Sequence, residues 1–397
     1  MSTRYITGGH TGPPLQTIMK NDRVFNCDVL VVGAGAAGVM AAVSAGQAGA
    51  KVILVEQASF IGGTAVKAGL KTICGDDSTA GIARRLCRGL KRKRVVMGKV
   101  QVLPVASGEF PRALARLIKD TPQVLLALKT KVIAAHANNS KVVLVACCKG
   151  NKKILVKPRA VIDASGDAGL VRSAGGAFME SPAGKRQLAG YTVELKGLLA
   201  FDETVKIRVP YYAACLVKEK NLPGWLRLAG FIPGNRAGRA YLRINLPDSV
   251  SGKAAARYTR RLHGYLAKRL SEFRNSVIID DDYRVVPRES ARVLGQYILT
   301  ARDVVAGRKF GDVAARGSWP IEFWSPKDGP IYKYAAGGHY DIPAGCLRAK
   351  SFDNVFCAGR CISADPIALA SARVLGIAMA TGEAAGKMAA GYAAQYR

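Results

Sequence analysis

The clearest pattern in the chain is the succession of apolar runs and helical periodicity between residues 27 and 57. Residues 28–32 and 52–55 are short apolar runs, and the Ala-rich segment between them is apolar at helical spacing. Apolar runs of this length predict buried strands, and the segment between them predicts a helix. We therefore predict a strand–helix–strand unit with two parallel strands.

The segments that follow predict a further mixture of helices and strands. A helical pattern covers residues 81–120, with a break near 104–108, and three strand-like runs follow at 123–135, 141–148 and 153–163. Short polar turns separate the three runs, which is typical of an antiparallel meander. A parallel unit followed by a meander predicts an α/β nucleotide-binding domain.

The later part of the chain departs from this pattern and then returns to it. It predicts, in chain order, antiparallel strands at 191–197 and 240–246, an amphipathic helix at 253–274, a helix at 290–306, a strand at 353–358 and a helix from about 366 to 393. We therefore predict an α/β fold in which a Rossmann-like domain, made of a parallel sheet and a β-meander, is interrupted by a mixed α+β substrate domain. The predicted division is an N-terminal arm at 1–25, the first part of the nucleotide-binding domain at 26–185, the inserted domain with its joint helices at 186–333 and the returning part at 334–397.

The turn after the first strand carries the motif Gly33-x-Gly35-x-x-Gly38. In a strand–turn–helix setting, the first glycine permits the tight turn, the second lets a pyrophosphate approach the backbone, and the third lets the helix pack close to the strands. The helix N-terminus adds free N–H groups for the phosphates. Glu56 follows the second strand, about twenty residues on, where an acid accepts a hydrogen bond from a ribose hydroxyl. The unit therefore predicts a dinucleotide site.

Composition narrows the class of protein. The 397 residues are 49% hydrophobic, and no run reaches the ~18 apolar residues of a membrane-spanning helix. The first residues show no secretion signal. The nine cysteines are scattered without a CxxC pair, which predicts a reducing, cytoplasmic location. With four histidines and no metal-ligand spacing, we expect no metal site.

Charge is the unusual feature of the composition. Lys and Arg number 59 against 28 acidic residues, which gives a net charge of +31. Residues 78–108 contain no acid, and basic residues gather there and again at 253–274. Such an excess favours an acidic protein or another anionic partner, with a generally basic surface as the alternative. Nucleic acid is less expected because aromatic residues are not interleaved with the basic runs.

Several segments resemble the FAD-dependent oxidoreductases of the two-domain, glutathione-reductase-like superfamily. Within it, the chain is most similar to a bacterial family related to the tRNA-uridine-modifying flavoprotein and to succinate dehydrogenase flavoproteins. The segments that carry the resemblance are VVGAGAAG (31–38) with Glu56, FIGGTAVKAG (60–69), VIDASGDAG (161–169), and the C-terminal pair 287–310 and 354–386. Residues 186–280 resemble the family only weakly.

The resemblance implies a Rossmann-like FAD-binding domain whose site is assembled from both ends of the chain. The glycine turn would hold the pyrophosphate, the loop at 61–64 would cross the flavin, the strand at 131–132 would meet the adenine, and the segment after Ala358 would reach the ribityl chain. The helix starting near Pro366 would direct its N-terminus to the flavin and stabilise the reduced, anionic ring. The implied cofactor-binding residues are Gly33, Gly35, Ala36, Ala37, Gly38, Glu56, Gln57, Gly62, Gly63, Thr64, Val132, Ala164, Ser165, Gly166, Asp167, Gly359, Arg360, Ala370 and Ser371.

The resemblance also implies residues near the substrate. Arg288, within an Arg-Glu-Ser signature, would bind a carboxylate or developing charge; the alternative is a buried Arg–Glu pair that braces the domain joint. His339 and Tyr340 stand in a Gly-Gly-His-Tyr turn where a general base would accept a proton, or in an ordinary surface loop. Cys74 and Cys361 are candidates for a redox thiol or a flavin attachment point, or are ordinary buried thiols.

We therefore expect an FAD-dependent oxidoreductase that transfers a hydride between a small-molecule substrate and flavin N5. A CH–NH or CH–OH donor is the first expectation. No second GxGxxG motif is present for NADPH. Two alternatives stay open: a flavoprotein that acts on tRNA or another anionic partner, and a flavin subunit that relays electrons within a complex.

Overall fold

The fold is that of a computed structural model. It describes residues 4–6, 23–75, 81–106, 108–182, 184–234, 236–279 and 285–396. Most of the arm expected at 1–25 lies outside these residues.

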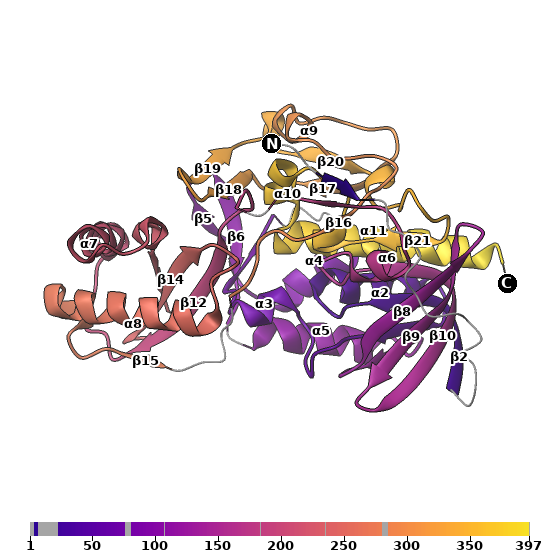
Figure 1. The fold of residues 1–397 in the computed structure, drawn as a ribbon, viewed down its shortest axis with the longest axis horizontal. Helices are drawn as coiled ribbons and strands as arrows, with labels where there is room; N and C mark the ends of the chain where they lie inside the picture. The colour runs from indigo at the N-terminus through magenta and orange to yellow at the C-terminus, as the bar shows by residue number, and fades with distance from the viewer. Residues whose placement is uncertain are drawn as a thin grey trace.

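Within the described residues, the largest element is a seven-stranded sheet to which both ends of the chain contribute (Figure 1). Its order is β7 (Val124–Ala127), β3 (Val52–Val55), β2 (Arg23–Val32), β10 (Lys152–Asp163), β9 (Lys141–Lys149) and β8 (Lys131–Asn138), with β21 (Val355–Cys357) also paired with β10. Strands β7, β3, β2, β10 and β21 pair in parallel, and β8, β9 and β10 form an antiparallel meander. Strand β10 belongs to both parts, since Val156 pairs with β9 whereas Val161 pairs with Leu30 and Val355.

The apolar runs are continuous because both faces of the parallel strands are buried. Val29 and Val31 of β2 pack in the core cluster that contains residues of α2 (Ala36–Gln47), α4 (Gly81–Gly89), α5 (Glu109–Lys119) and α11 (Leu375–Ala394). Leu30 and Val32 pack on the opposite face with residues of the meander and β21. The predicted strand–helix–strand unit is confirmed. The predicted meander is confirmed for β8, β9 and β10, but the run expected at 123–135 is divided, since β7 pairs in parallel with β3.

Helix α11 lies along α2 at backbone contact (Figure 1). A Cβ added to Gly382 would stand 2.2 Å from the carbonyl oxygen of Ala37, and one added to Gly386 would stand 2.3 Å from that of Ala41. Glycine is therefore required at both positions for the two helices to approach this closely. The C-terminal helix is thereby packed against the helix that follows the glycine turn.

A second, antiparallel sheet carries the strands predicted at 191–197 and 240–246. Its order is β13 (Gly230–Pro233), β14 (Arg239–Leu246), β12 (Ala189–Lys196) and β15 (Val277–Ile279). Helices α7 (Val205–Lys220) and α8 (Gly252–Arg269) share a core with this sheet and form one unit with it at the left of Figure 1. The predicted amphipathic helix is confirmed as α8, which buries Leu262 and Leu266.

Smaller elements lie between the two sheets and around the joint. They are the sheet of β4 (Thr72–Cys74), β6 (Val100–Pro104) and β5 (Val95–Met97), the sheet of β1 (Arg4–Ile6), β11 (Phe178–Glu180) and β16 (Arg292–Val293), the pairs β17 (Val313–Gly317) with β20 (Tyr340–Pro343) and β18 (Ile321–Ser325) with β19 (Gly329–Lys333), and the helices α3 (Thr64–Lys67), α6 (Gly169–Ser173), α9 (Ala301–Val305) and α10 (Pro366–Ala372).

Two of the helix predictions are wrong over much of the range that they cover. The helical pattern at 81–120 is interrupted by β5 and β6, whose β-branched residues pair around a turn at 98–99. Of 290–306, only Ala301–Val305 is helical. The preceding residues instead form bridges with distant segments, Gly295 with Ala349 and Leu299 with Ala364, and these tertiary contacts outweigh helical propensity.

The long C-terminal helix is also divided. Helices α10 and α11 are bent by 93° at a break after Ala372, where Val374 adopts an extended backbone with φ −68° and ψ 159°. Among the described helices, none alone is long and apolar enough to cross a membrane; α10 and α11 meet that criterion only when the bent pair is taken together.

The contact between α2 and α11 gives a stability prediction. We expect Gly386→Ala to lower the free energy of unfolding by about 1–3 kcal/mol, because the added methyl group overpacks a backbone contact. Gly391→Ala, in the same helix but with open space around the new Cβ, is the control and should raise it by about 0.5–1 kcal/mol through helix propensity. Urea unfolding of both variants measures the difference, and equal effects would contradict the packing account.

Candidate functional site

The glycine turn is built by close contact with the loop after β10. Gly33 has φ 101°, and a Cβ there would lie 2.5 Å from the carbonyl oxygen of Ala164. A Cβ on Gly38 would lie 1.8 Å from the carbonyl oxygen of Gly33. Gly35 differs, because a Cβ there would meet no atom within 4 Å. The first and third glycines are thus required by protein packing, whereas Gly35 faces open space where a ligand has room.

Glu56 stands beside this turn at the end of β3. Its Oε2 accepts a hydrogen bond from the backbone N–H of Ala34 at 2.8 Å, and its Oε1 accepts one from the N–H of Ala58, also at 2.8 Å. The side chain is 8% exposed and its exposed part lines the cavity described next. Each carboxylate oxygen keeps a second lone pair, so Glu56 fixes the turn and can still accept a hydroxyl from a ligand.

One cavity of about 1090 Å³ begins at the glycine turn. This volume lies at the upper end of the ~300–1,000 Å³ range of small-molecule sites, as an extended dinucleotide together with a substrate requires. The residues of the expected cofactor site that line it are Gly33, Gly35, Ala36, Ala37, Glu56, Gln57, Gly62, Gly63, Thr64, Val132, Ala164, Ser165, Gly166, Asp167, Gly359 and Arg360. Together with the open space at Gly35, this wall fits FAD.

The loop at 62–63 lies directly against the turn. The N–H of Gly62 donates to the carbonyl oxygen of Ala34 at 2.8 Å, and Gly62 bridges to Gly35. A Cβ on Gly63 would approach the Cα of Gly35 to 3.0 Å. These small residues leave the cavity side of the loop unobstructed.

The loop after β10 is held from below by Asp163. This buried carboxylate accepts hydrogen bonds from the N–H groups of Ser165, Leu170 and Val171 at 3.1 Å each. Cys361 also lies beneath the loop, where its Sγ accepts the N–H of Gly166 at 3.0 Å. Burial raises the pKa of the Cys361 thiol, and Cys361 does not line the cavity. Its position is that of a buried thiol that supports the loop.

The helix whose N-terminus faces the cavity is α11 rather than α10, which was the helix expected to face the flavin. The N-terminus of α10 is capped by Asp365, whose Oδ1 accepts from the N–H groups of Ile367 and Ala368, and Pro366 does not line the cavity. The wall is formed instead by Val374, Leu375 and Ala378 at the start of α11. The positive end of a helix therefore does face the cavity, but it belongs to the helix after the 93° bend.

Besides Gly38, four of the expected site residues do not line the cavity. Ser371 is fully buried, its hydroxyl 2.7 Å from that of Tyr340, and Ala370 is buried beside it. Burial raises the pKa of the Tyr340 hydroxyl. His339 is outside the cavity wall, and its Nδ1 lies 3.1 Å from the carbonyl oxygen of Gly337. Neither His339 nor Tyr340 lines this cavity, and the general base expected at 339–340 stays a prediction.

Arg288 does line the cavity, and it does not stand alone there. Arg243 from β14 and Arg373 from the break between α10 and α11 line the same cavity, and their positive charges lower the pKa of Arg288. We call Arg243, Arg288 and Arg373 the arginine cluster. Glu322 of β18 lies with them in the wall. The sequence did not single out Arg243, Glu322 or Arg373, which come from segments that only the fold brings together.

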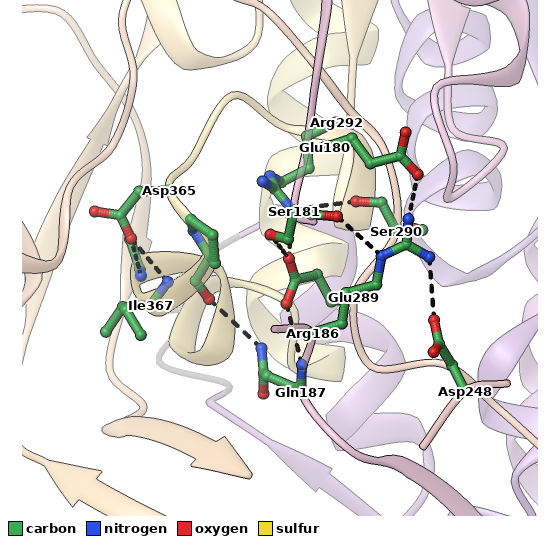
Figure 2. Close-up of polar contacts among 12 residues, drawn as sticks. Glu180, Ser181, Arg186, Gln187, Asp248, Glu289, Ser290, Arg292, Asp365 and Ile367 are labelled. Atoms are coloured by element: carbon green, nitrogen blue, oxygen red, sulfur yellow. Dashed lines mark hydrogen bonds and ion pairs between the residues drawn. The ribbon is translucent and has the colours of Figure 1, made fainter. Parts of the chain in front are cut away.

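The neighbours of Arg288 form the buried joint that was the alternative expectation. Glu289 and Arg292 are 1% and 0% exposed and pair at 3.1 Å. Figure 2 shows Glu289 also accepting from the hydroxyl of Ser181 and from the N–H of Gln187. The Nε2 amide of Gln187 reaches the carbonyl oxygen of Pro366. The Arg-Glu-Ser signature therefore contributes in both of the expected ways. Arg288 lines the cavity, and the Glu289–Arg292 pair forms a buried joint with the neighbouring chain segments.

Cys74 lines the cavity from β4. Burial raises the pKa of its thiol to about 11. The group is therefore a neutral thiol at physiological pH, and a thiolate is the form that reacts. Among the described residues, no group of His, Cys, Asp and Glu side chains is arranged to hold a metal ion.

Cavity geometry gives a prediction for Gly35. We expect Gly35→Val to weaken FAD binding by about 10- to 100-fold, because the side chain enters the space in which charged hydrogen bonds to a pyrophosphate would form. The free energy of unfolding of the cofactor-free protein should change little. Gly38→Ala is the contrast, since its Cβ collides with Gly33 and should lower stability as well. Fluorescence titration with FAD measures affinity; unchanged affinity in Gly35→Val would contradict the assigned turn.

Thiol chemistry gives a pH prediction. Raising the pKa of the Cys74 thiol from 9.0 to about 11 lowers its thiolate fraction at pH 8 by about 100-fold. Iodoacetamide should therefore label Cys74 about 100-fold more slowly in the folded protein than in urea, and the rate should rise about tenfold per pH unit from 8 to 10. Peptide mass mapping follows the label. Rapid labelling at pH 8 would instead identify a reactive thiolate.

Two curated relatives match short stretches of the chain. The 4-oxocyclohex-2-ene-1-carboxylate 5-dehydrogenase of Sinomonas cyclohexanicum is 41% identical over 63 residues, which is 16% of this chain and 11% of that protein. Sarcosine oxidase subunit alpha of Rhizobium meliloti (strain 1021) is 56% identical over 39 residues, which is 10% of this chain and 4% of that protein. The matched stretches thus span a small part of either relative.

Solved structures are similar over a longer range and at lower identity. A geranylgeranyl bacteriochlorophyll reductase-like protein from Thermoplasma acidophilum aligns over 93% of this chain and 78% of its own, with 14% identity and a TM-score of 0.49. The p-nitrophenol 4-monooxygenase of Pseudomonas putida DLL-E4 aligns over 91% and 77%, with 14% identity and a TM-score of 0.45.

A family match covers nearly the whole chain. The family described as FAD dependent oxidoreductase matches residues 28–396. That range contains the glycine turn, Glu56, the loop after β10 and both helices of the C-terminal segment. The chain therefore belongs to the FAD-dependent oxidoreductase family, and FAD is its cofactor.

Proposed function

We propose that the chain transfers a hydride between a small organic substrate and N5 of FAD. The favoured hydride donor is a CH–NH or CH–OH group of the substrate. The observation that carries the proposal is the continuity of the cavity. The wall that fits FAD and the wall with the arginine cluster belong to the same space. A substrate held beside the arginine cluster would thus share one cavity with the cofactor.

The residues of this chain would bind and orient the two reactants, and FAD supplies the electron-accepting chemistry when bound. The N-terminus of α2 offers N–H groups to the pyrophosphate beside Gly35, and Glu56 would accept a ribose hydroxyl. The first turn of α11 presents the positive end of its dipole to the cavity, which favours negative charge there.

An anaerobic reduction experiment tests this function. The purified protein should be yellow and release FAD, identified by mass, and its visible absorbance should be lost when an amine, amino acid or alcohol from a panel is added without oxygen. A colourless protein that cannot be reconstituted with FAD would contradict the proposal. So would an FAD-loaded protein that dithionite reduces but that no member of the panel reduces.

A second candidate function involves an anionic macromolecule, and the favouring observation is an exposed basic segment. Arg85 and Arg88 of α4 are exposed, as are Lys91, Arg92, Lys93 and Arg94 after it. Charges so placed would attract tRNA or an acidic protein. In the same preparation, nucleic acid or an acidic protein retained at moderate salt would favour this candidate, because purely non-specific contacts weaken steeply with salt.

A further inference from the structure

One part of the cavity wall is rich in positive charge, because three arginines line it and lie close enough to act on one another. Arg243, Arg288 and Arg373 line it, and each comes from a different part of the fold: β14, the segment before β16, and the break between α10 and α11. Among the described residues, none of the three forms an ion pair within 4.0 Å. Guanidinium groups gathered in a protein interior are costly unless anionic groups accompany them.

Neutral groups hold the cluster in place. Arg288 donates to Oδ1 of Asn245 at 2.7 Å, and its guanidinium lies 4.6 Å from the centre of the Trp324 ring. Arg243 donates from Nε to the hydroxyl of Thr192 at 3.4 Å. These contacts fix the arginines in position through neutral partners and add no negative charge.

Arg373 also lacks a full set of hydrogen-bond partners. It donates to the backbone carbonyl oxygen of Glu322 at 3.3 Å, and its Nε is buried without a hydrogen-bond partner in the described structure. A buried donor of this kind is costly unless a ligand supplies the acceptor.

The carboxylate of Glu322 accepts hydrogen bonds from two indole groups. Its Oε1 accepts from the indole N–H of Trp324 at 2.9 Å, and its Oε2 accepts from that of Trp319 at 3.1 Å. Glu322 therefore offsets one positive charge electrostatically without a direct contact to a guanidinium. The described cluster of three arginines and one glutamate retains two positive charges.

The arginines also act on one another. Burial lowers the pKa of Arg288 well below its usual range, and the positive charges of Arg373 and Arg243 lower it further. A dianion placed among them would relieve both the burial cost and the mutual repulsion. Guanidinium groups present paired donors that match the two oxygens of a carboxylate.

We propose that the arginine cluster binds the substrate as a dianion, and that this substrate is a dicarboxylate. The inference rests on the proposed function, since it places the substrate in the cavity that fits FAD. Its carboxylates would meet Arg243, Arg288 and Arg373, and the bond that is oxidised would lie between them and the flavin. Substrates of equal size without negative charge would bind far more weakly.

Binding to the oxidised, FAD-loaded protein tests the proposal without turnover. The probes are succinate, its neutral analogue succinamide, and inorganic phosphate as the rival dianion, followed by calorimetry and by the change in flavin absorbance. We expect succinate to bind more tightly than the other two. In Arg243→Gln, its Kd should rise about 10- to 100-fold, as loss of a charged hydrogen bond implies.

Arg257→Gln is the matched control, because it removes the same charge from the exposed face of α8; its Kd for succinate should stay within about twofold of the wild-type value. FAD content and thermal unfolding verify that each variant is folded, and Arg373→Gln replaces Arg243→Gln if the latter is not. Equal binding of succinamide, tighter binding of phosphate, or equal effects of Arg243→Gln and Arg257→Gln would overturn the proposal.

Failure of this inference is distinguishable from failure of the proposed function. If an uncharged amine or alcohol reduces the flavin rapidly while succinate does not bind, hydride transfer stands and the dicarboxylate assignment is overturned. If succinate binds as expected but no panel compound, dicarboxylic amino and hydroxy acids included, reduces the flavin, the arginine cluster stands and the proposed reaction is contradicted.

Discussion

The structure depends on backbone contact around the first βα turn. The turn at Gly33 lies against Ala164, Gly62 is hydrogen-bonded to Ala34, and Gly382 of α11 lies against Ala37. Segments that are far apart in the chain can meet there only because their contact positions carry no side chain. The same contacts that exclude side chains on the protein side leave open space on the ligand side at Gly35.

The part of the cavity wall that carries the arginine cluster has a different physical origin. It is made by long side chains that reach inward from β14, β18 and the break before α11, and it is stabilised by neutral hydrogen bonds and indole rings. The buried Glu289–Arg292 pair stands next in sequence to Arg288 and fixes the segment that carries it. A rigid joint thus supports the residue that faces the cavity, which is how a charged group is kept oriented without a charged partner.

The wall at the glycine turn could be predicted from the sequence better than the wall with the arginine cluster, because the first is built from short contiguous motifs. The glycine turn, Glu56 and the loop after β10 are contiguous motifs whose function depends on nearby backbone. Arg243 alternates with Leu242 and Ile244 along β14, a pattern that an ordinary solvent-exposed face would also produce. The Ala-rich run after Pro366 gives no sign of a break near Arg373, so the position of that arginine depends on tertiary packing. His339 and Tyr340 do not line the cavity, and a turn motif alone does not determine which of its side chains face a cavity.

The central claim is that one cavity holds FAD by its glycine turn and a substrate by its arginine cluster. A crystal structure of the FAD-bound protein tests this most directly. The account predicts the pyrophosphate beside Gly35, the ribose at Glu56 and the flavin ring directed toward Arg243, Arg288 and Arg373. A cofactor bound elsewhere, or one whose ring is directed away from the arginine cluster toward the meander, would contradict it.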